Sequence, residues 1–212
     1  MRAVRLALLG PLFASLALPA CDPKPALVQE VVRVPYSTIT LPRLDGWMED
    51  PSLKSSDAAQ GGTVLRLVQR SGVAGAPRID IMLEPKRPSP TNLKEYVRQN
   101  LREMGSLEAA GRLRILRVEQ QEVQIDQIPA VRVQHEFTTG HGNAQMSLFQ
   151  VSLFLVYNGR GVTVTASGRT ELFHPQAQAI AYLLQGLRIG TGSRQDAADT
   201  PTIDLGRVGG GR

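Results

Sequence analysis

The chain has 212 residues, of which 24 are basic and 19 acidic, and its formal net charge is +5 at pH 7. A single cysteine excludes an intramolecular disulfide and a cysteine-based zinc site. The basic residues are scattered along the chain, which argues against the concentrated basic face of a nucleic-acid-binding protein. We therefore expect one domain with additional terminal segments and no nucleic-acid partner.

Residues 1–20 have the pattern of a secretory signal. Arg2 and Arg5 give a positive start, and Leu6 to Leu18 is a mostly apolar stretch of thirteen residues without charge. A membrane-spanning helix needs about 20 such residues, so this stretch is too short to stay as an anchor. We expect residues 1–20 to be removed after export.

The signal ends at Leu18-Pro19-Ala20-Cys21. This sequence resembles the bacterial lipobox, in which an aliphatic residue, a tolerant position and a small residue precede a cysteine. The resemblance implies cleavage between Ala20 and Cys21 and attachment of lipid to the Cys21 thiol. Because each buried CH₂ contributes about 0.8 kcal/mol and one acyl chain binds only marginally, two or three chains on one residue would anchor the protein firmly.

The alternative for Cys21 is an incidental cysteine that follows an ordinary cleavage site. Asp22 resembles the signal that retains lipoproteins in the inner membrane of enteric bacteria, a rule that other lineages do not follow reliably. We expect a lipid-anchored protein in the inner or the outer membrane of a bacterium, with its domain in the periplasm or another extracytoplasmic space.

The mature chain divides into three parts. Residues 21–35 are expected to be the lipidated cysteine and a proline-rich tether, although the valines from Val28 to Val34 also fit an edge strand. Residues 36–190 form the folded domain. Residues 191–212 contain few large apolar side chains, so we expect a disordered tail. A docking motif around Ile203 and Leu205 is the alternative for the tail.

Within the domain, apolar and polar residues mostly alternate, which predicts strands. Residues Phe149 to Tyr157 are apolar on both faces of the expected strand, which predicts a central strand that is covered on both sides. Asn158-Gly159 then predicts a hairpin. The other expected strands are Ser37–Leu41, Thr63–Gln69, Ile79–Glu84, Arg114–Ile125, Pro129–Phe137 and Val162–Ser167.

Two segments have helical periodicity. The first runs from about Thr91 to Met104, with Ser89 or Thr91 as its N-cap and Gly105 at its end. The second runs from Pro175 to Leu187. The order of strands and helices predicts an α+β fold, in which helices pack on the faces of an antiparallel β-sheet.

Five short segments of the domain match a known family: Leu41-Pro42 with Gly46-Trp47, Leu93–Tyr96, Ile125–Ala130, Tyr157–Gly161 and Leu187–Ile189. Through these segments the domain resembles the PsbP-like superfamily, which includes the bacterial DcrB-like lipoproteins. The resemblance covers residues 36–190 and implies an αβα sandwich. Because its motifs are mostly turns and core residues, the resemblance indicates fold more than activity. Members of the superfamily mostly act as non-catalytic binding, assembly or chaperone-like modules.

The residues that could carry chemistry are few. The sequence contains no Gly-x-Ser-x-Gly nucleophile elbow. It also contains no glycine-rich, phosphate-binding loop before a helix. We therefore expect no catalytic residue and no cofactor. His135, His141 and His174 lack the spacing of a metal site, and none is expected. His135 shares the inward face of its strand with Val131 and Phe137, which favours a core histidine. The alternative is a hydrolase site built from His135 and a carboxylate.

Trp47 is the only tryptophan, and it fits either a core residue or the aromatic wall of a binding groove. Arg66 and Arg132 could add a polar rim to such a groove. The leading hypothesis is therefore a membrane-anchored, non-catalytic binding or assembly module that holds an envelope protein or a small ligand. The alternatives are an envelope hydrolase around His135 and a structural lipoprotein that docks through its C-terminal tail.

Overall fold

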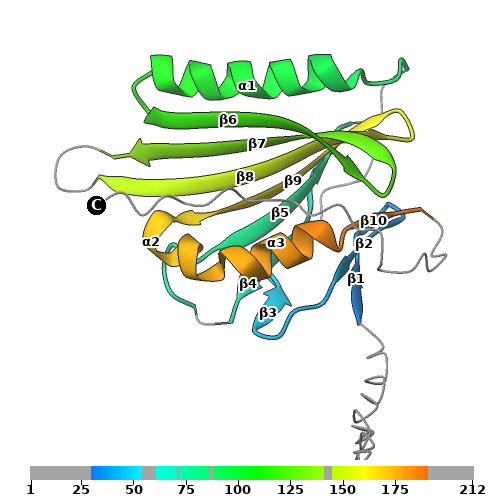
Figure 1. Ribbon diagram of the computed structural model, residues 1–212, viewed down its shortest axis with the longest axis horizontal. Coiled ribbons are helices and arrows are strands. Elements are labelled where there is room, and N and C mark those ends of the chain that lie inside the picture. Colours follow the sequence, from blue (N-terminus) through cyan, green and yellow to red (C-terminus); the bar gives the residue numbers. More distant parts are fainter. Residues whose placement is uncertain (1–29, 54–60, 71, 86–87, 141–144, 191–212) are drawn as a thin grey trace, which may run out of the picture.

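The computed structural model describes residues 30–53, 61–70, 72–85, 88–140 and 145–190. These residues form two antiparallel sheets, one on each side of a shared core, together with helices (Figure 1). The larger sheet has the strand order β3 (Trp47–Glu49), β4 (Gly62–Gln69), β5 (Arg78–Leu83), β9 (Arg160–Arg169), β8 (Met146–Tyr157), β7 (Ile128–Thr139) and β6 (Leu113–Ile125). The smaller sheet has the order β1 (Val31–Arg33), β2 (Ile39–Pro42) and β10 (Arg188–Ile189).

The expectation of a central strand at Phe149–Tyr157 is confirmed. Strand β8 lies between β9 and β7, with four strands on one side of it and two on the other. Phe154 packs into the cluster on one face of the sheet, and Val151, Leu153 and Leu155 pack into the main core on the other. A strand that is covered on both faces needs apolar residues in successive positions, which is the pattern of this segment.

Helix α1 (Leu93–Ala109) covers one face of the large sheet, which we call the α1 face. Tyr96 and Val97 of this helix pack on Val131, Val133 and Phe154 of the sheet. Leu93 and Leu101 extend this contact along the helix, as the apolar stripe predicts.

Both expected ends of α1 need correction. The N-cap is Asn92 and not Ser89 or Thr91. The Asn92 side chain accepts a hydrogen bond from the backbone N–H of Glu95. The helix also continues through Gly105 to Ala109. Gly111, with a φ of 68°, ends it: Gly111 N donates to Glu108 O and Arg112 N to Leu107 O. This is a Schellman motif, which favours glycine in the left-handed position.

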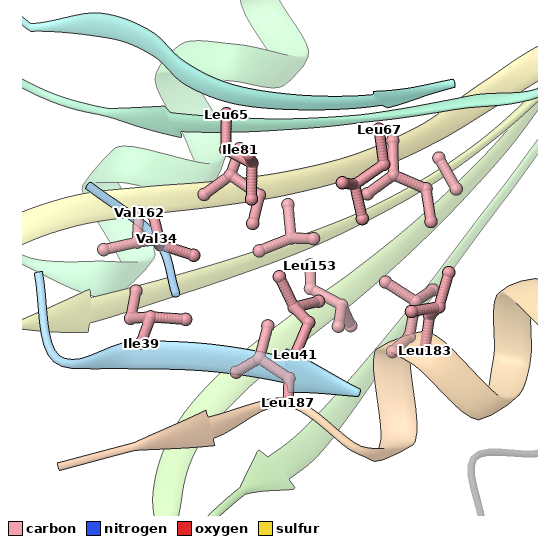
Figure 2. Packing of buried hydrophobic residues seen from close by; sticks show 14 of the residues in the cluster. Val34, Ile39, Leu41, Leu65, Leu67, Ile81, Leu153, Val162, Leu183 and Leu187 are labelled. Carbon is pink, nitrogen blue, oxygen red and sulfur yellow. The ribbon is translucent and has the colours of Figure 1, made fainter. Parts of the chain in front are cut away.

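The opposite face of the large sheet, the α3 face, is covered by a mixed layer. Helix α3 (Ala177–Gln185) and the small sheet share this layer, and their side chains meet those of the large sheet in the main core (Figure 2). The expected sandwich of helices on both faces is therefore only partly observed, because a second sheet occupies part of one outer layer. Strand β1 pairs with β2, which supports the edge-strand interpretation of this valine-rich segment.

The second predicted helix is divided. Thr170–Phe173 forms a short helix α2, His174–Gln176 forms a 3₁₀ turn, and α3 begins only at Ala177. Pro175 lies in the turn instead of the first turn of the helix, and the last predicted residue, Leu187, lies beyond α3 but is fully buried. The part of the chain that the structure describes contains no helix long and apolar enough to cross a bilayer.

Candidate binding site

A polar region occupies part of the α3 face of the large sheet. On this face, strand β7 is apolar at its start and polar further along. Ala130, near the start, belongs to the main core, whereas the polar residues Arg132, Gln134 and Thr138 follow on the same face. On the neighbouring edge strand β6, Glu119 lies directly opposite Gln134. The apolar layer of this face therefore gives way to hydrogen-bonding groups on β6 and β7.

An open hollow of about 370 Å³ lies over this region. It is lined by Glu119, Gln120, Gln121 and Arg132. Gln121 and Arg132 are direct cross-strand partners in the β6–β7 ladder, so their side chains project from the same face of the sheet. Glu119, Gln121 and Arg132 therefore bring a carboxylate, a carboxamide and a guanidinium to the hollow, which together can donate and accept hydrogen bonds. Gln120, the cross-strand partner of Val133, projects to the other face.

Gln134 adds an unsatisfied group to this polar region. The residue is 8% exposed, and its Oε1 atom has no hydrogen-bond partner. A buried acceptor without a partner costs about 1–3 kcal/mol, because it loses water and gains nothing in return. Gln134 does not line the hollow, so this buried acceptor is closed to a ligand that lies there.

Arg66 lies on the opposite face. It projects from β4 on the α1 face, where its Nε donates to Asp80 Oδ1 at 2.5 Å. Arg78 binds the other carboxylate oxygen of Asp80 at 3.0 Å. The hydrogen bond to Asp80 is the main reason why the pKa of Arg66 is raised above its usual value. Asp80 is buried, so this pairing explains how its charge is tolerated there.

Asp50 forms a weaker, outer part of the same network. Its carboxylate lies 3.7 Å from Arg66 Nη1 and accepts hydrogen bonds from the backbone and the hydroxyl of Ser52. The bonds from Ser52, more than the nearby Arg66, lower the pKa of Asp50 below its usual value. Arg66 is therefore part of an ion network on the surface of the sheet, where it orders β4 and β5.

Trp47 is a core residue. It lies at the start of β3, is 5% exposed and packs in the main core with Leu67 and the α3 side chains. It therefore does not form the wall of an open groove. Trp47, Arg66 and Arg132 do not come together: one is buried in the core, one lies on the α1 face and one lines the hollow on the α3 face. Of the three, only Arg132 lies at a concave surface.

His135 projects toward the α1 face, away from the hollow. It is 2% exposed, and burial lowers the pKa of its imidazole below the usual value. Its Nδ1 atom has no hydrogen-bond partner. In hydrolases that use a histidine base, this nitrogen is normally held by a carboxylate. The expected sharing of one face with Val131 and Phe137 agrees with the β6–β7–β8 register.

Of the other two histidines, the structure describes only His174. His174 begins the 3₁₀ turn and packs edge-on against Phe149, with ring centroids 5.5 Å apart. His141, Cys21 and Ala20 lie outside the described residues. Among the residues that the structure describes, no three His, Cys, Asp or Glu side chains are grouped so that they could hold a metal ion.

Glu119, Gln121 and Gln134 were not predicted as site residues from the sequence. On β7 the signal was present in the alternation of apolar and polar residues, whereas β6 is polar on both faces from Glu119 to Glu122. Without the strand order, that alternation fits any half-exposed edge strand equally well.

No family model matches this chain, and no curated protein matches it. Solved structures do match. Cyanobacterial PsbP (CyanoP) from Synechocystis sp. PCC 6803 aligns over 80% of this chain and 97% of its own, with 10% identity and a TM-score of 0.53. The described residues therefore have a PsbP-like fold.

Two further structures align less well. Mycobacterium tuberculosis LpqN, described as involved in cell envelope biogenesis, aligns over 75% of this chain and 88% of its own, with 13% identity and a TM-score of 0.44. The Saccharomyces cerevisiae Ran-binding protein Mog1p aligns over 76% and 95%, with 11% identity and a TM-score of 0.46.

Proposed function

We propose that this protein is a membrane-anchored lipoprotein of the bacterial cell envelope that acts as a non-catalytic binding or assembly module. The observation that carries the proposal is the open polar hollow over β6 and β7, which the largely buried Arg132 lines together with Glu119 and Gln121 from the same face of the sheet. The hollow lies on the α3 face of the large sheet, whereas the buried His135 projects toward the α1 face. The partner is an envelope protein or a small ligand with both donors and acceptors of hydrogen bonds.

The chemistry of the hollow favours a polar ligand over an apolar one. Glu119 and Gln121 are two positions apart on β6 and share a face, so they repeat at the spacing of alternate residues in an extended strand. A peptide group offers a carbonyl for the carboxamide of Gln121 or the guanidinium of Arg132, and an N–H for the carboxylate of Glu119. An extended segment of a protein partner therefore fits this face well.

The anchor is the second part of the proposal. It rests on Leu18-Pro19-Ala20-Cys21 and on the charged and apolar regions that precede it. The PsbP-like fold is consistent with the resemblance to DcrB-like lipoproteins and their αβα sandwich, although fold alone does not define function. Lipid attached to Cys21 would hold the hollow near the membrane that carries its partner.

The alternative of an envelope hydrolase has less support. A general base must reach the proton that it removes, yet His135 is almost fully buried and its Nδ1 has no carboxylate partner. The alternative of docking through residues 191–212 concerns a segment outside the described residues, so it is tested by deletion.

A photo-crosslinking amino acid at Gln121 tests the hollow directly. We expect it to capture a defined partner in intact cells, and we expect Arg132→Ala to reduce that capture several-fold. The matched control is the same group at Gln124, an exposed residue on the other face of β6. Equal capture from both positions, or capture that requires residues 191–212 and not Arg132, would contradict the proposed site.

A further inference from the structure

The small sheet has an outer face that the core does not use. Arg33 on β1, Thr40 on β2 and Arg188 on β10 lie in one row across the three strands, and Val31 projects on the same side as Arg33. The opposite face packs inward, with Ile39 and Leu41 fully buried. The outer face is therefore a separate surface, on the side of the large sheet away from α1 (Figure 1).

This outer face is basic. The three strands contain two arginines and no acidic residue. Glu30 comes directly before β1, but its carboxylate is paired with Arg43 at 2.8 Å. The Arg188 guanidinium donates to Gln185 O and Leu187 O, which fixes it at the end of α3. An anionic surface is the complement of this arrangement.

Tyr36 stands at one end of the outer face, in the turn between β1 and β2. It is 58% exposed and has a φ of 59°, a backbone conformation that residues other than glycine rarely adopt. The turn is fixed by hydrogen bonds from Val34 N to Ile39 O and from the Ser37 hydroxyl to Val34 O. A strained, rigid turn that exposes a tyrosine ring indicates a contact outside the domain.

The anchor limits which surface can reach the bilayer. Val31 follows Cys21 by ten positions, so the chain between them spans at most about 35 Å even when fully extended. The β1 end therefore lies within about 35 Å of the anchored residue, so its outer face can reach the bilayer. Tyrosine favours the membrane–water interface, and arginine favours anionic head groups.

We propose that the outer face of the small sheet, with Tyr36, Val31, Arg33 and Arg188, rests on the anionic surface of the bilayer to which Cys21 is attached. This inference rests on the lipid anchor proposed above. The contact fixes the orientation of the domain, so that α1 points away from the membrane (Figure 1).

The single native cysteine makes the contact measurable. Lipid occupies the Cys21 thiol, so Tyr36→Cys introduces one free thiol, which can carry an environment-sensitive fluorophore. The lipidated mature protein is reconstituted into phosphatidylglycerol-containing vesicles that carry a head-group quencher. We expect several-fold stronger quenching at this position than in the matched variant Arg102→Cys, an exposed residue of α1. We also expect weaker quenching in pure phosphatidylcholine and with Arg33→Glu.

Three results would overturn this contact. The first is equal quenching at positions 36 and 102 in protein with acylated Cys21. The second is quenching at position 36 that does not change with lipid charge or with Arg33→Glu. The third is an unmodified Cys21, detected by mass spectrometry of the same preparation, which would contradict the anchor itself. Thermal unfolding of each variant shows whether its fold is retained.

Discussion

His135 is the buried ionisable residue whose environment has the clearest consequence for stability. Its cross-strand neighbours are Val118 and Gln150, and burial disfavours the charged imidazolium. The pKa in the folded state therefore lies below 6.5, the value expected for the unfolded chain. As the pH falls through this range, the unfolded chain takes up a proton first, and the folded state loses stability.

We expect His135→Leu to reduce this acid sensitivity. Urea unfolding of the wild type, measured well above and well below pH 6.5, should show a fall in the free energy of unfolding on acidification. The variant should show a smaller fall over the same interval. An equal fall in both proteins would mean that other groups control the acid response.

The turn between β6 and β7 carries two residues in the left-handed region. Asp126 and Gln127 have φ angles of 50° and 66°, as in a type I′ turn. Asp126 has a second role, because its carboxylate accepts a hydrogen bond from Ile189 N of β10 at 2.9 Å. For Gln127, a positive φ brings a steric cost, because its Cβ lies close to the backbone in the left-handed conformation.

Gln127→Gly should therefore stabilise the protein by up to about 1 kcal/mol, because glycine adopts a positive φ without a steric penalty. Gln124→Gly is the matched control, since Gln124 lies within β6 and gains nothing from the added freedom. We expect the control to lose about 0.5–1 kcal/mol. Chemical denaturation measures both, and a destabilising Gln127→Gly would contradict the turn geometry.

At the scale of elements, the start of α1 is held against the β8–β9 hairpin. Thr91 N donates to Gly159 O, and the Thr91 hydroxyl donates to Glu84 Oε2. The same carboxylate oxygen accepts from Gly161 N at 3.2 Å. Tyr96 OH forms a hydrogen bond with the Thr163 hydroxyl at 2.6 Å. Glu84 therefore joins the loop before α1 to β9.

Gly161 has no room for a side chain at this junction. A Cβ there would lie 2.6 Å from Glu84 Oε2 and 2.7 Å from Tyr96 Cζ. We expect Gly161→Ala to destabilise the fold by about 1–3 kcal/mol.

At Gly105, inside α1, the corresponding Cβ would meet open space. Gly105→Ala should stabilise by up to about 1 kcal/mol. Thermal unfolding separates the two, and stabilisation by both would refute the close packing at Gly161.

The elements that the sequence predicted well are those with a strong local pattern. Phe149–Tyr157 has apolar residues on both faces of the strand. Asn158-Gly159 has the residues that a type I′ turn requires. The end of α1 was missed because glycine at position 105 costs too little to stop a helix that Leu107 and the Gly111 cap continue. Strand β10 was not predicted, because its pairing with β2 depends on contacts remote in sequence.

At the scale of the whole molecule, the candidate site depends on which face each strand residue takes. Trp47, Arg66 and Arg132 were predicted as residues of one possible groove, and the structure places them apart: Arg132 lines the hollow, Trp47 lies in the core and Arg66 pairs with Asp80 on the opposite face. The alternation of Leu65, Arg66 and Leu67 shows that Arg66 points away from the core. It does not reveal that Arg132 points toward the opposite face, because that requires the order of all seven strands.

The polar hollow and the basic outer face of the small sheet lie in different parts of the molecule. The hollow lies over β6 and β7 at one edge of the large sheet, whereas the basic outer face belongs to the small sheet beside the N-terminal segment. Both surfaces lie on the side of the large sheet away from α1, so if the small sheet rests on the bilayer, the hollow opens on the membrane side of the domain. The two surfaces consist of different residues, so we expect variants in one to leave the other intact.

The most direct test of the central claim is metabolic labelling of growing cells with a radioactive fatty acid. We predict that the mature protein carries the label and sediments with membranes, and that Cys21→Ser abolishes the label and releases the protein from the membrane. An unlabelled mature protein, with a serine variant that stays equally membrane-bound, would contradict the account.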